Sequence, residues 1–360
     1  MRVVQRKDLQ TLLLDRVKEL GGEIVWGKKY ADYYNAQDEM GYPGRLKIIF
    51  EDESQVYTDL IVGADGIWSM VRKHIVGMDG ATARDRQVPG WDQKWKPDFA
   101  FQEGIYGVSK RVEGTDSNPG DTHWVLLDIG TASTWALPDG KQFWTISLPS
   151  SAAPVRSAGG ANREYTKNGA EISTGGYSIE STEAILKSFE DIWHPVLGTF
   201  GEVFKSSERI VRTSLWHHAW WGYQTGNHEG LVVIGDASRV MLPTSGQGAC
   251  FGIEDATVLA NALLNHPPES AGRRGVTFEK AIEKYQRLRR ERSDKMTKQS
   301  YWTAVVTLGE WWWWRWLRDF AMAWLPMSAD PKAPKKGPAK DPMGWLHDVR
   351  YKVVLAPDIE

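Results

Sequence analysis

The segment Leu231–Asp255 constrains the fold more than any other part of this 360-residue chain. Its sequence is LVVIGDASRVMLPTSGQGACFGIED, and the apolar run Gly230–Gly235 that opens it predicts a buried strand. A glycine-rich turn and a helix from about Gly252 to Leu264 follow. A buried strand that runs into a helix is typical of α/β proteins, which bind ligands where such strands end. The segment therefore predicts an α/β fold with a ligand site at this turn.

The residue types in the turn indicate what kind of ligand it could hold. Asp236 follows the strand directly, where its carboxylate can accept hydrogen bonds from sugar-type hydroxyls. Gly246 and Gly248 would let a flat ligand approach the backbone closely. The unpaired N–H groups of the helix that follows would stabilise negative charge.

A second segment, Gly63–Arg72 (GADGIWSMVR), follows the apolar run LIVG and opens another predicted helix. Asp65 is placed to hydrogen-bond through water to phosphate or ribose groups, and Ser69 to cap the first helical turn. For Arg72 a phosphate contact and a charge on the helix surface are both open.

The two segments together resemble the FAD-dependent monooxygenases of the para-hydroxybenzoate hydroxylase-like (aromatic hydroxylase) family. GDxxxxxxPxxGQGxxxxxED is similar to the family's second FAD motif, and GADGxxSxVR to its motif for the FAD pyrophosphate and the nicotinamide cofactor. The order and spacing of the two segments also fit. Arg6, in VVQRKDLQTLL, resembles the helix arginine that contacts FAD in the family.

This resemblance assigns roles to eight residues. Asp236 would bind the ribityl chain, Pro243 would line the flavin near its reactive face, and Asp65 and Arg6 would contact the cofactor. The contacts to the isoalloxazine ring would come from Gly246, Gln247, Gly248 and Ala249. The resemblance identifies no catalytic side chain.

Two features depart from the family's pattern. Arg239 stands where the family usually has histidine, and we expect it near the flavin. The N-terminal GxGxxG unit of the family is not found. A shortened gene model, a genuine short form with weak FAD binding and a redox-inactive derivative are the three explanations. At the end of the segment, Glu254 either orients the glycine turn or belongs to a solvated helix face.

The rest of the chain predicts helices at both ends and an antiparallel sheet in the middle. The expected fold is α/β, with an N-terminally truncated Rossmann-like FAD-binding domain interleaved with an antiparallel substrate-binding sheet and followed by C-terminal helices. Four regions are predicted: residues 1–90 (first FAD-binding segment, truncated), 91–215 (substrate-binding sheet), 216–300 (second FAD-binding segment) and 301–360 (aromatic-rich helical region and tail).

Periodicity places individual elements within this scheme. Helices are expected at Val3–Leu20, Thr182–Phe189 and Phe278–Thr303, and a loop at Ser150–Gly176. Strands are expected at Glu23–Trp26, Arg45–Glu51, Gln55–Gly63, Phe101–Val108, Thr122–Ile129, Gln142–Leu148 and Arg209–Leu215.

Composition narrows the class of protein further. A net charge of -2 gives no reason to expect a nucleic-acid partner. The single cysteine, Cys250, suggests a reducing compartment and is expected to be a buried apolar side chain. The paired His217 and His218 make a poor metal site, and no metal is predicted. We expect an intracellular protein, cytoplasmic or peripherally bound to a membrane.

Nineteen tryptophans are unusual for this length, and many lie near the C-terminus. The segment from Tyr301 to Trp324 is too charged to span a bilayer, so it either packs as a helix over the protein or contacts a membrane interface. In the middle sheet, Tyr106, His123 and Trp144 are candidates to meet the substrate, with ordinary packing as the alternative.

The function implied by the resemblance is an enzyme, an FAD- and NAD(P)H-dependent monooxygenase. It would insert one oxygen atom from O₂ into an organic substrate by hydroxylation or epoxidation, in specialised (secondary) metabolite biosynthesis. The alternative is a redox-inactive derivative of the same fold, acting as a cofactor-free isomerase or cyclase or as a binding protein.

Overall fold

The computed structural model describes residues 5–36, 46–78, 95–111, 122–137, 140–151, 164–166, 169–218, 230–270, 276–308 and 312–324. The chain divides into two compact units. Unit 1 contains residues 1–24, 99–215 and 305–327, and unit 2 contains residues 25–98, 216–304 and 328–360. Elements β5, β13 and α6 run across the boundaries. No helix among the described residues is long and apolar enough to cross a membrane.

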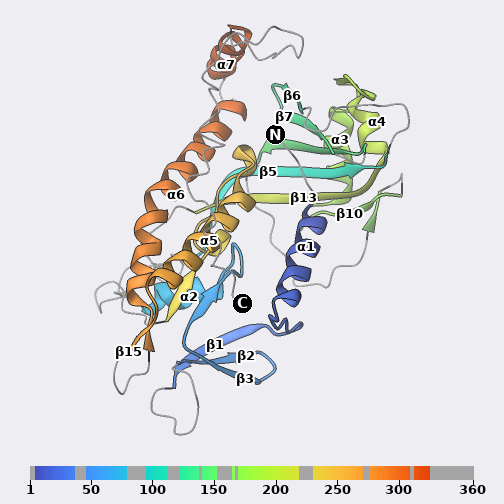
Figure 1. Cartoon of the computed structure of the whole chain (residues 1–360). Coiled ribbons are helices and arrows are strands. Elements are labelled where there is room, and N and C mark those ends of the chain that lie inside the picture. The colour runs from blue at the N-terminus through green and yellow to red at the C-terminus, as the bar shows by residue number, and fades with distance from the viewer. Residues whose placement is uncertain are drawn as a thin grey trace. The chain divides into compact units, whose positions relative to one another are not determined.

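Unit 1 is built on a mixed seven-stranded sheet, most of whose strands are antiparallel (Figure 1). The strand order is β6-β7-β8-β5-β13-β10-β9, and β10 is parallel to β13. The strands are β5 (Asp98–Ser109), β6 (Thr122–Leu126), β7 (Thr131–Ala136), β8 (Gln142–Pro149), β9 (Glu164–Tyr165), β10 (Glu171–Ser173) and β13 (Ser207–His217). The antiparallel sheet expected from the sequence is therefore present, with the added strands β7, β9 and β10.

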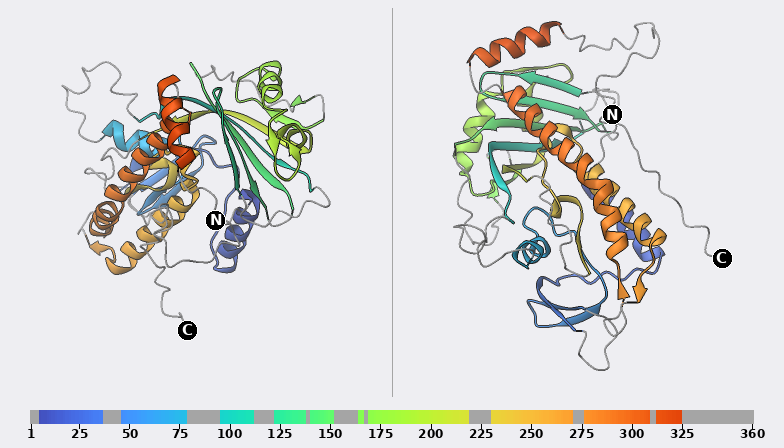
Figure 2. Two further views of the ribbon diagram at one scale, coloured as in Figure 1. Left: turned by 90° about the horizontal axis from the view of Figure 1, so that it is seen from above. Right: turned by 90° about the vertical axis from the view of Figure 1, so that its left-hand side faces the viewer.

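Helices α3 (Ile179–Ser188) and α4 (Phe200–Lys205) lie on one face of this sheet (Figure 2). The short hairpin of β11 (Trp193–His194) and β12 (Gly198–Thr199) joins them. Ile105, Trp144 and Ile146 point toward these helices and form a core with Phe189 and Phe200.

The opposite face of the sheet carries a row of aromatic side chains. The rings of Tyr106 and Phe143 are 6.5 Å apart, those of Phe143 and Trp135 5.4 Å, and those of Trp135 and Trp124 6.1 Å. Of the three substrate candidates, Tyr106 lies in this row. Trp144 is fully buried under α4, where it packs on Phe204. The alternative of ordinary packing is thus the correct one for Trp144.

His194 is buried in unit 1 and is held in its neutral form by geometry. Its Nδ1 accepts the backbone N–H groups of Val196 and Leu197 (3.3 and 3.1 Å), so Nε2 carries the proton, 2.9 Å from Thr134 Oγ1. Burial, together with the neighbouring His123, lowers the pKa of His194 to about 4.

This histidine predicts a loss of stability in mild acid. In the unfolded chain His194 gains a proton near pH 6.5, whereas in the folded chain it does so only near pH 4. The unfolded state therefore binds more protons between these values, and stability falls as the pH drops from about 6.5 to 4. We expect a cost of about 2 kcal/mol at pH 5 relative to pH 7, measured by urea denaturation. A His194→Gln variant should lose this contribution and keep that of His218, whose pKa burial also lowers to about 4. An equal dependence in wild type and variant would contradict the assignment.

Unit 1 also contains three helical segments from the two ends of the chain. These are α1 (Arg6–Glu19), the end of α6 and α7 (Trp312–Trp324). Helix α1 confirms most of the N-terminal helix expected from the sequence, and Leu12, Leu13 and Val17 on it are exposed.

Unit 2 contains a parallel pair of strands, β4 (Ile61–Gly63) and β14 (Leu231–Val233). It also holds an antiparallel sheet of β1 (Tyr30–Asn35), β2 (Leu46–Phe50) and β3 (Gln55–Thr58), and a short pair of β15 (Glu269–Ser270) and β16 (Val276–Thr277). Its helices are α2 (Met70–Met78), α5 (Gly248–Asn265) and most of α6 (Glu279–Leu308). Apolar side chains of β14, α5 and α6 share one core around Val232, Val258 and Tyr285.

Three sequence expectations for unit 2 need correction. Residues 23–26 form no strand in the structure, where the first strand is β1. The expected strand Gln55–Gly63 divides into two, because β3 pairs with β2 whereas β4 pairs with β14. Helix α5 begins at Gly248, four residues before the predicted start, so the Gly-Gln-Gly sequence itself starts the helix.

Candidate functional site

The candidate site in unit 2 starts where the parallel strands β4 and β14 end. Gly63 closes β4, and a Cβ at this position would lie 2.7 Å from Cβ of Val71 on α2. Only glycine allows the strand and the helix to approach this closely. Because both strands run in the same direction, the loops that follow them, at Asp65 and at Asp236, leave the same edge of the pair.

Asp65 and Ser69 shape the first of these loops. Asp65 Oδ2 accepts the backbone N–H of Met70 at 2.7 Å, at the start of α2, and Ser69 Oγ accepts that of Arg72 at 2.9 Å. The cap expected from Ser69 is present. Asp65 stays exposed to solvent while it holds this turn, and its contact with a cofactor remains a prediction.

Asp236 lies in the second loop, on the short 3-10 turn η3 (Gly235–Ala237). Gly235 enters this turn with φ of 59°, a left-handed conformation that other residues adopt at a cost. Asp236 is exposed, whereas Ala237, Ser238 and Arg239 after it are buried. The turn thus presents one carboxylate to solvent.

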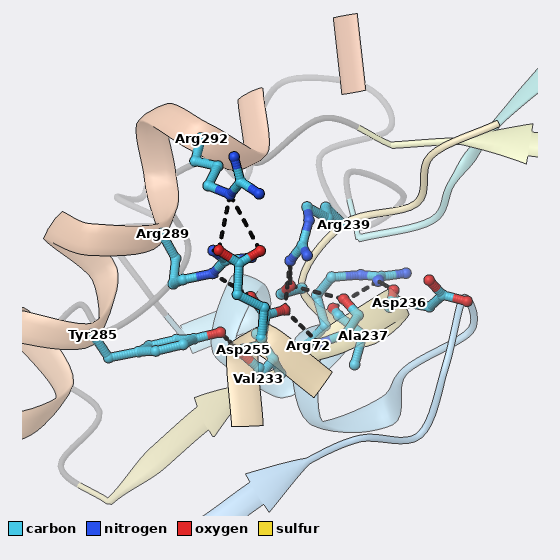
Figure 3. Close-up of polar contacts among 12 residues, drawn as sticks. Arg72, Val233, Asp236, Ala237, Arg239, Asp255, Tyr285, Arg289 and Arg292 are labelled. Atoms are coloured by element: carbon cyan, nitrogen blue, oxygen red, sulfur yellow. Dashed lines mark hydrogen bonds and ion pairs between the residues drawn. The ribbon is translucent and has the colours of Figure 1, made fainter. Parts of the chain in front are cut away.

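Arg72 joins the two loops, although 164 residues separate it from Asp236. Its guanidinium donates to the backbone carbonyls of Asp236 (3.2 Å) and Ala237 (2.8 Å) and also to those of Ile67 and Trp95. Figure 3 shows the side chain reaching across to Asp236 and Ala237. Of the two roles left open for Arg72, neither is correct. It is fully buried and holds the two loops together.

A buried cluster of ion pairs, formed by residues of α5, α6 and the segment after η3, supports the turn at Gly235 (Figure 3). Asp255 on α5 accepts the backbone N–H of Gly235 at 2.8 Å and a hydrogen bond from Arg239 Nη1 at 2.6 Å. Its other oxygen accepts Arg289 Nε on α6, also at 2.6 Å. All three charged side chains are at most 1% exposed. Asp255 therefore fixes the turn that carries Asp236, a role that the sequence did not reveal.

Arg239 and Glu254 both belong to this cluster, and the expected position of Arg239 near the flavin stays a prediction. Arg239 is bound inside the cluster, over the ring of Phe251, instead of presenting its charge to a ligand. Glu254 pairs with Arg289 (2.7 Å) and Arg292 (2.8 Å), so it is neither on a solvated face nor at the glycine turn. A histidine in place of Arg239 would not extend as far as this arginine does to pair with Asp255.

The glycine-rich turn precedes α5. Pro243–Ser245 forms the 3-10 turn η4, and Gly246 ends it with φ of 62°. Thr244 Oγ1 donates to the carbonyl of Ser300 on α6 at 2.7 Å, and Ser300 Oγ donates to the carbonyl of Leu242. Helix α6 thereby holds the turn in place.

The start of α5 has the features of a site for a negatively charged group. Among the residues described, no side chain caps the helix, whose first-turn N–H groups include those of Gly248 and Ala249. A Cβ added to Gly248 would meet no described atom within 4 Å. Pro243, Gly246 and Ala249 are exposed, whereas Gln247 is buried. A flat ligand with a negatively polarised edge fits this donor set, as the isoalloxazine of FAD would.

Cys250 differs from its expected environment. It lies in the first turn of α5 and is exposed. The expectation of a buried cysteine was wrong.

The paired histidines lie on either side of the end of β13. His218 is buried and forms an isolated bridge with Val240, and His217 packs on Tyr301. Burial lowers the pKa of His218 to about 4, and the nearby Arg72 adds to this effect. Among the described residues, no three His, Cys, Asp or Glu side chains gather in a way that could hold a metal ion.

Arg6 lies in unit 1, on α1, where it is exposed. The other seven predicted cofactor residues belong to unit 2. The contact expected from Arg6 with the cofactor stays a prediction.

Comparison with known proteins shows what this chain is similar to. Residues 190–300 match the family described as FAD binding domain. FAD-dependent monooxygenase paxM of Penicillium paxilli is 29% identical over 67% of this chain and 46% of its own length, and FAD-dependent monooxygenase pynG of Aspergillus niger is 26% identical over 61% and 47%. The chain spans about half the length of these curated relatives.

Solved structures show the same fold. Klebsiella pneumoniae HpxO, determined with FAD and uric acid, superimposes with a TM-score of 0.59 at 17% identity, over 88% of this chain and 68% of its own. A salicylate hydroxylase in a substrate complex gives a TM-score of 0.58 at 19% identity, over 89% and 72%. The fold is that of the FAD-binding flavoprotein hydroxylases. By sequence, residues 190–300 match an FAD binding domain, and about two thirds of the chain is similar to curated FAD-dependent monooxygenases.

Proposed function

We propose that this protein is an FAD-dependent monooxygenase that uses NAD(P)H and O₂ to oxidise a small organic molecule in secondary metabolism. The observation that carries the proposal is the arrangement of the turn at Asp236 and the uncapped start of α5, both held by buried side chains. The names of the fungal relatives, which are FAD-dependent monooxygenases, support the reaction type.

Each predicted cofactor residue has a physical task in this proposal. Asp236 would accept hydrogen bonds from the ribityl hydroxyls of FAD, and the N–H groups at Gly248 and Ala249 would stabilise negative charge on the isoalloxazine. Gly246, Gln247 and Pro243 would shape the surface on which the ring lies, and Asp65 and Arg6 would contact the nucleotide end. When bound, FAD would supply the redox chemistry of the reaction.

The aromatic row of Tyr106, Phe143, Trp135 and Trp124 in unit 1 suits an apolar, aromatic substrate. Residues 91–215 are therefore proposed to bind the substrate, and residues 1–90 and 216–300 to bind FAD.

The proposal is tested by the visible absorption spectrum of the purified full chain before and after addition of FAD. A bound flavin, its reduction by NADH or NADPH, and oxygen consumption that depends on an added aromatic compound would support the monooxygenase. A colourless protein that does not bind added FAD would support the alternative, a redox-inactive derivative of the fold.

Asp236 provides a sharper test of the site. We expect Asp236→Ala to raise the dissociation constant for FAD about 10–100-fold, because the ribityl hydroxyls lose a charged acceptor, worth about 1.5–3 kcal/mol. Fluorescence titration with FAD would measure this change. Asp191→Ala is the matched control, since Asp191 is an exposed aspartate of unit 1 and should leave the constant unchanged. Equal dissociation constants for Asp236→Ala and wild type would rule out this position as a flavin contact.

A further inference from the structure

The face of the unit 1 sheet that carries the aromatic row also carries hydroxyl groups. Ser133 on β7 pairs with Trp124 on one side and with Thr145 on the other. Thr145 on β8 pairs in turn with Tyr106 on β5. Paired residues of an antiparallel sheet lie on the same face. One line of side chains across the four strands therefore has an aromatic ring at each end and two hydroxyls in the middle.

A second pair of hydroxyls lies beside the first. Thr131 pairs with Ser147, and each is two residues along its strand from Ser133 or Thr145. Residues two apart in a strand share a face, so all four hydroxyl side chains are on the face of the aromatic row. These four residues, Thr131, Ser133, Thr145 and Ser147, are called the hydroxyl block below.

The hydroxyl block has hydrogen-bonding capacity that the protein does not use. Ser133 Oγ and Thr145 Oγ1 are 3.4 Å apart, which is long for a bond between two hydroxyls. This is the single side-chain hydrogen bond of the block within the described part of the chain. Each hydroxyl can donate one hydrogen bond and accept two. Because Thr131, Thr145 and Ser147 are partly exposed, a bound molecule could use this capacity.

The rings around the block limit the shape of such a molecule. Trp124 and Tyr106 are 45% and 37% exposed, and exposed aromatic rings favour stacking against another flat ring. At about 4.8 Å between neighbouring strands, the line from Trp124 to Tyr106 is about 14 Å long. A single benzene ring is too short to contact both ends, whereas fused rings extend farther along the line.

The hydroxyls limit the chemistry of the molecule. Small-molecule sites combine an apolar lining with a few polar groups that fix the orientation of the ligand. A wholly apolar ligand would remove water from the block without replacing its hydrogen bonds, at a cost of about 1–3 kcal/mol for each group left unpaired. A ligand with its own hydroxyl or carbonyl group would avoid this cost.

We propose that the aromatic row and the hydroxyl block form one binding surface for a fused-ring aromatic molecule that carries a hydroxyl or carbonyl group. Thr145 determines this specificity, because it lies between Tyr106 and Ser133 and is more exposed than Ser133. The inference rests on the proposed function, in which residues 91–215 bind the substrate, and it adds the chemical class of that substrate.

Equilibrium dialysis of the full chain against two probes tests the inference. The probes are 2-naphthol and 2-methylnaphthalene, which have similar size and differ in a hydroxyl or a methyl group. Thr145→Val keeps the shape of the side chain and removes its hydroxyl. We expect this variant to raise the dissociation constant for 2-naphthol about 3–10-fold, the value of one neutral hydrogen bond, and not to raise that for 2-methylnaphthalene.

Three further variants control the experiment. Thr145→Ser keeps the hydroxyl and should bind 2-naphthol like the wild type. Thr174→Val is the matched control, since Thr174 is a partly exposed threonine of unit 1 outside the hydroxyl block, and it should bind both probes like the wild type. Ser147→Ala should weaken 2-naphthol binding in the same direction. It provides the test if thermal unfolding shows that Thr145→Val does not fold.

Two results would overturn the inference. One is a wild type that does not bind 2-naphthol up to its solubility limit. The other is an unchanged ratio of the two dissociation constants in folded Thr145→Val and Ser147→Ala. Dialysis needs neither NAD(P)H nor turnover, so its outcome is separate from that of the flavin test. A chain that selects 2-naphthol through Thr145 but binds no FAD would support this inference and contradict the monooxygenase.

Discussion

Asp255→Ala is expected to lower the free energy of unfolding by about 3–5 kcal/mol, which corresponds to a fall in melting temperature on the order of 10 °C. The substitution leaves the guanidinium groups of Arg239 and Arg289 in the interior without the carboxylate that neutralises them. It also removes the acceptor of the Gly235 N–H. Urea denaturation of the variant and the wild type would measure the change.

Two further variants identify which loss matters. Asp255→Asn keeps the size of the side chain and one oxygen acceptor for Gly235, but it removes the charge, so an intermediate loss is expected. In Asp255→Ala/Arg239→Met, one of the two buried arginines that lose their carboxylate partner is removed as well. This double variant should be more stable than the sum of the two single effects predicts. Additive effects would show that Asp255 and Arg239 are not coupled as the structure indicates.

The elements with strong local signals were predicted well from the sequence. Helix α3 and strands β5, β8 and β13 have alternating or helical apolar patterns, and each is found within a few residues of its expected position. The two loops after β4 and β14 were also predicted. In each, a short apolar run that ends at glycine predicted a buried strand, and the aspartate that follows marked the loop. Both segments also match the longer motifs of the aromatic hydroxylase family, which strengthened the prediction.

Long-range pairing explains most of what was missed. The run from Gln55 to Gly63 is continuous in sequence, but its two halves pair with strands in different regions of the chain. Strand β7 has the sequence TASTWA, whose small and polar residues carry little apolar signal. Such strands depend on their neighbours in the sheet more than on their own residues.

The buried charged residues that hold the site in place could not be predicted for a related reason. A charged residue on a predicted helix is usually solvated, and nothing in the sequence of α6 marks Arg289 as an exception. Arg289 is instead fully buried, and together with Arg239 it neutralises Asp255. Three charged residues at positions 239, 255 and 289 cannot be recognised as one cluster until the fold brings them together. The signal that could have suggested it is the Glu254-Asp255 pair on a helix opposite an arginine-rich one.

Arg72→Met is the second substitution with a large expected effect, a loss of at least about 3 kcal/mol of stability together with weaker FAD binding. The guanidinium donates to four backbone carbonyls, of Ile67, Trp95, Asp236 and Ala237. Hydrogen bonds from charged groups contribute about 1.5–3 kcal/mol each, and methionine can replace none of them. The buried carbonyls that lose their donor add to the cost.

The effect on FAD follows because Arg72 is the physical link between the loops that hold Asp65 and Asp236. Without it the two carboxylates lose their fixed separation, so we expect the dissociation constant for FAD to rise at least about tenfold under conditions where the variant is still folded. Arg287→Met is the matched control, because Arg287 is an exposed arginine on α6, and both its stability and its FAD titration should match the wild type. If Arg72→Met lowered stability but left FAD affinity unchanged, the two loops would not act together in holding the cofactor. The role of Arg72 would then be confined to the folding of unit 2.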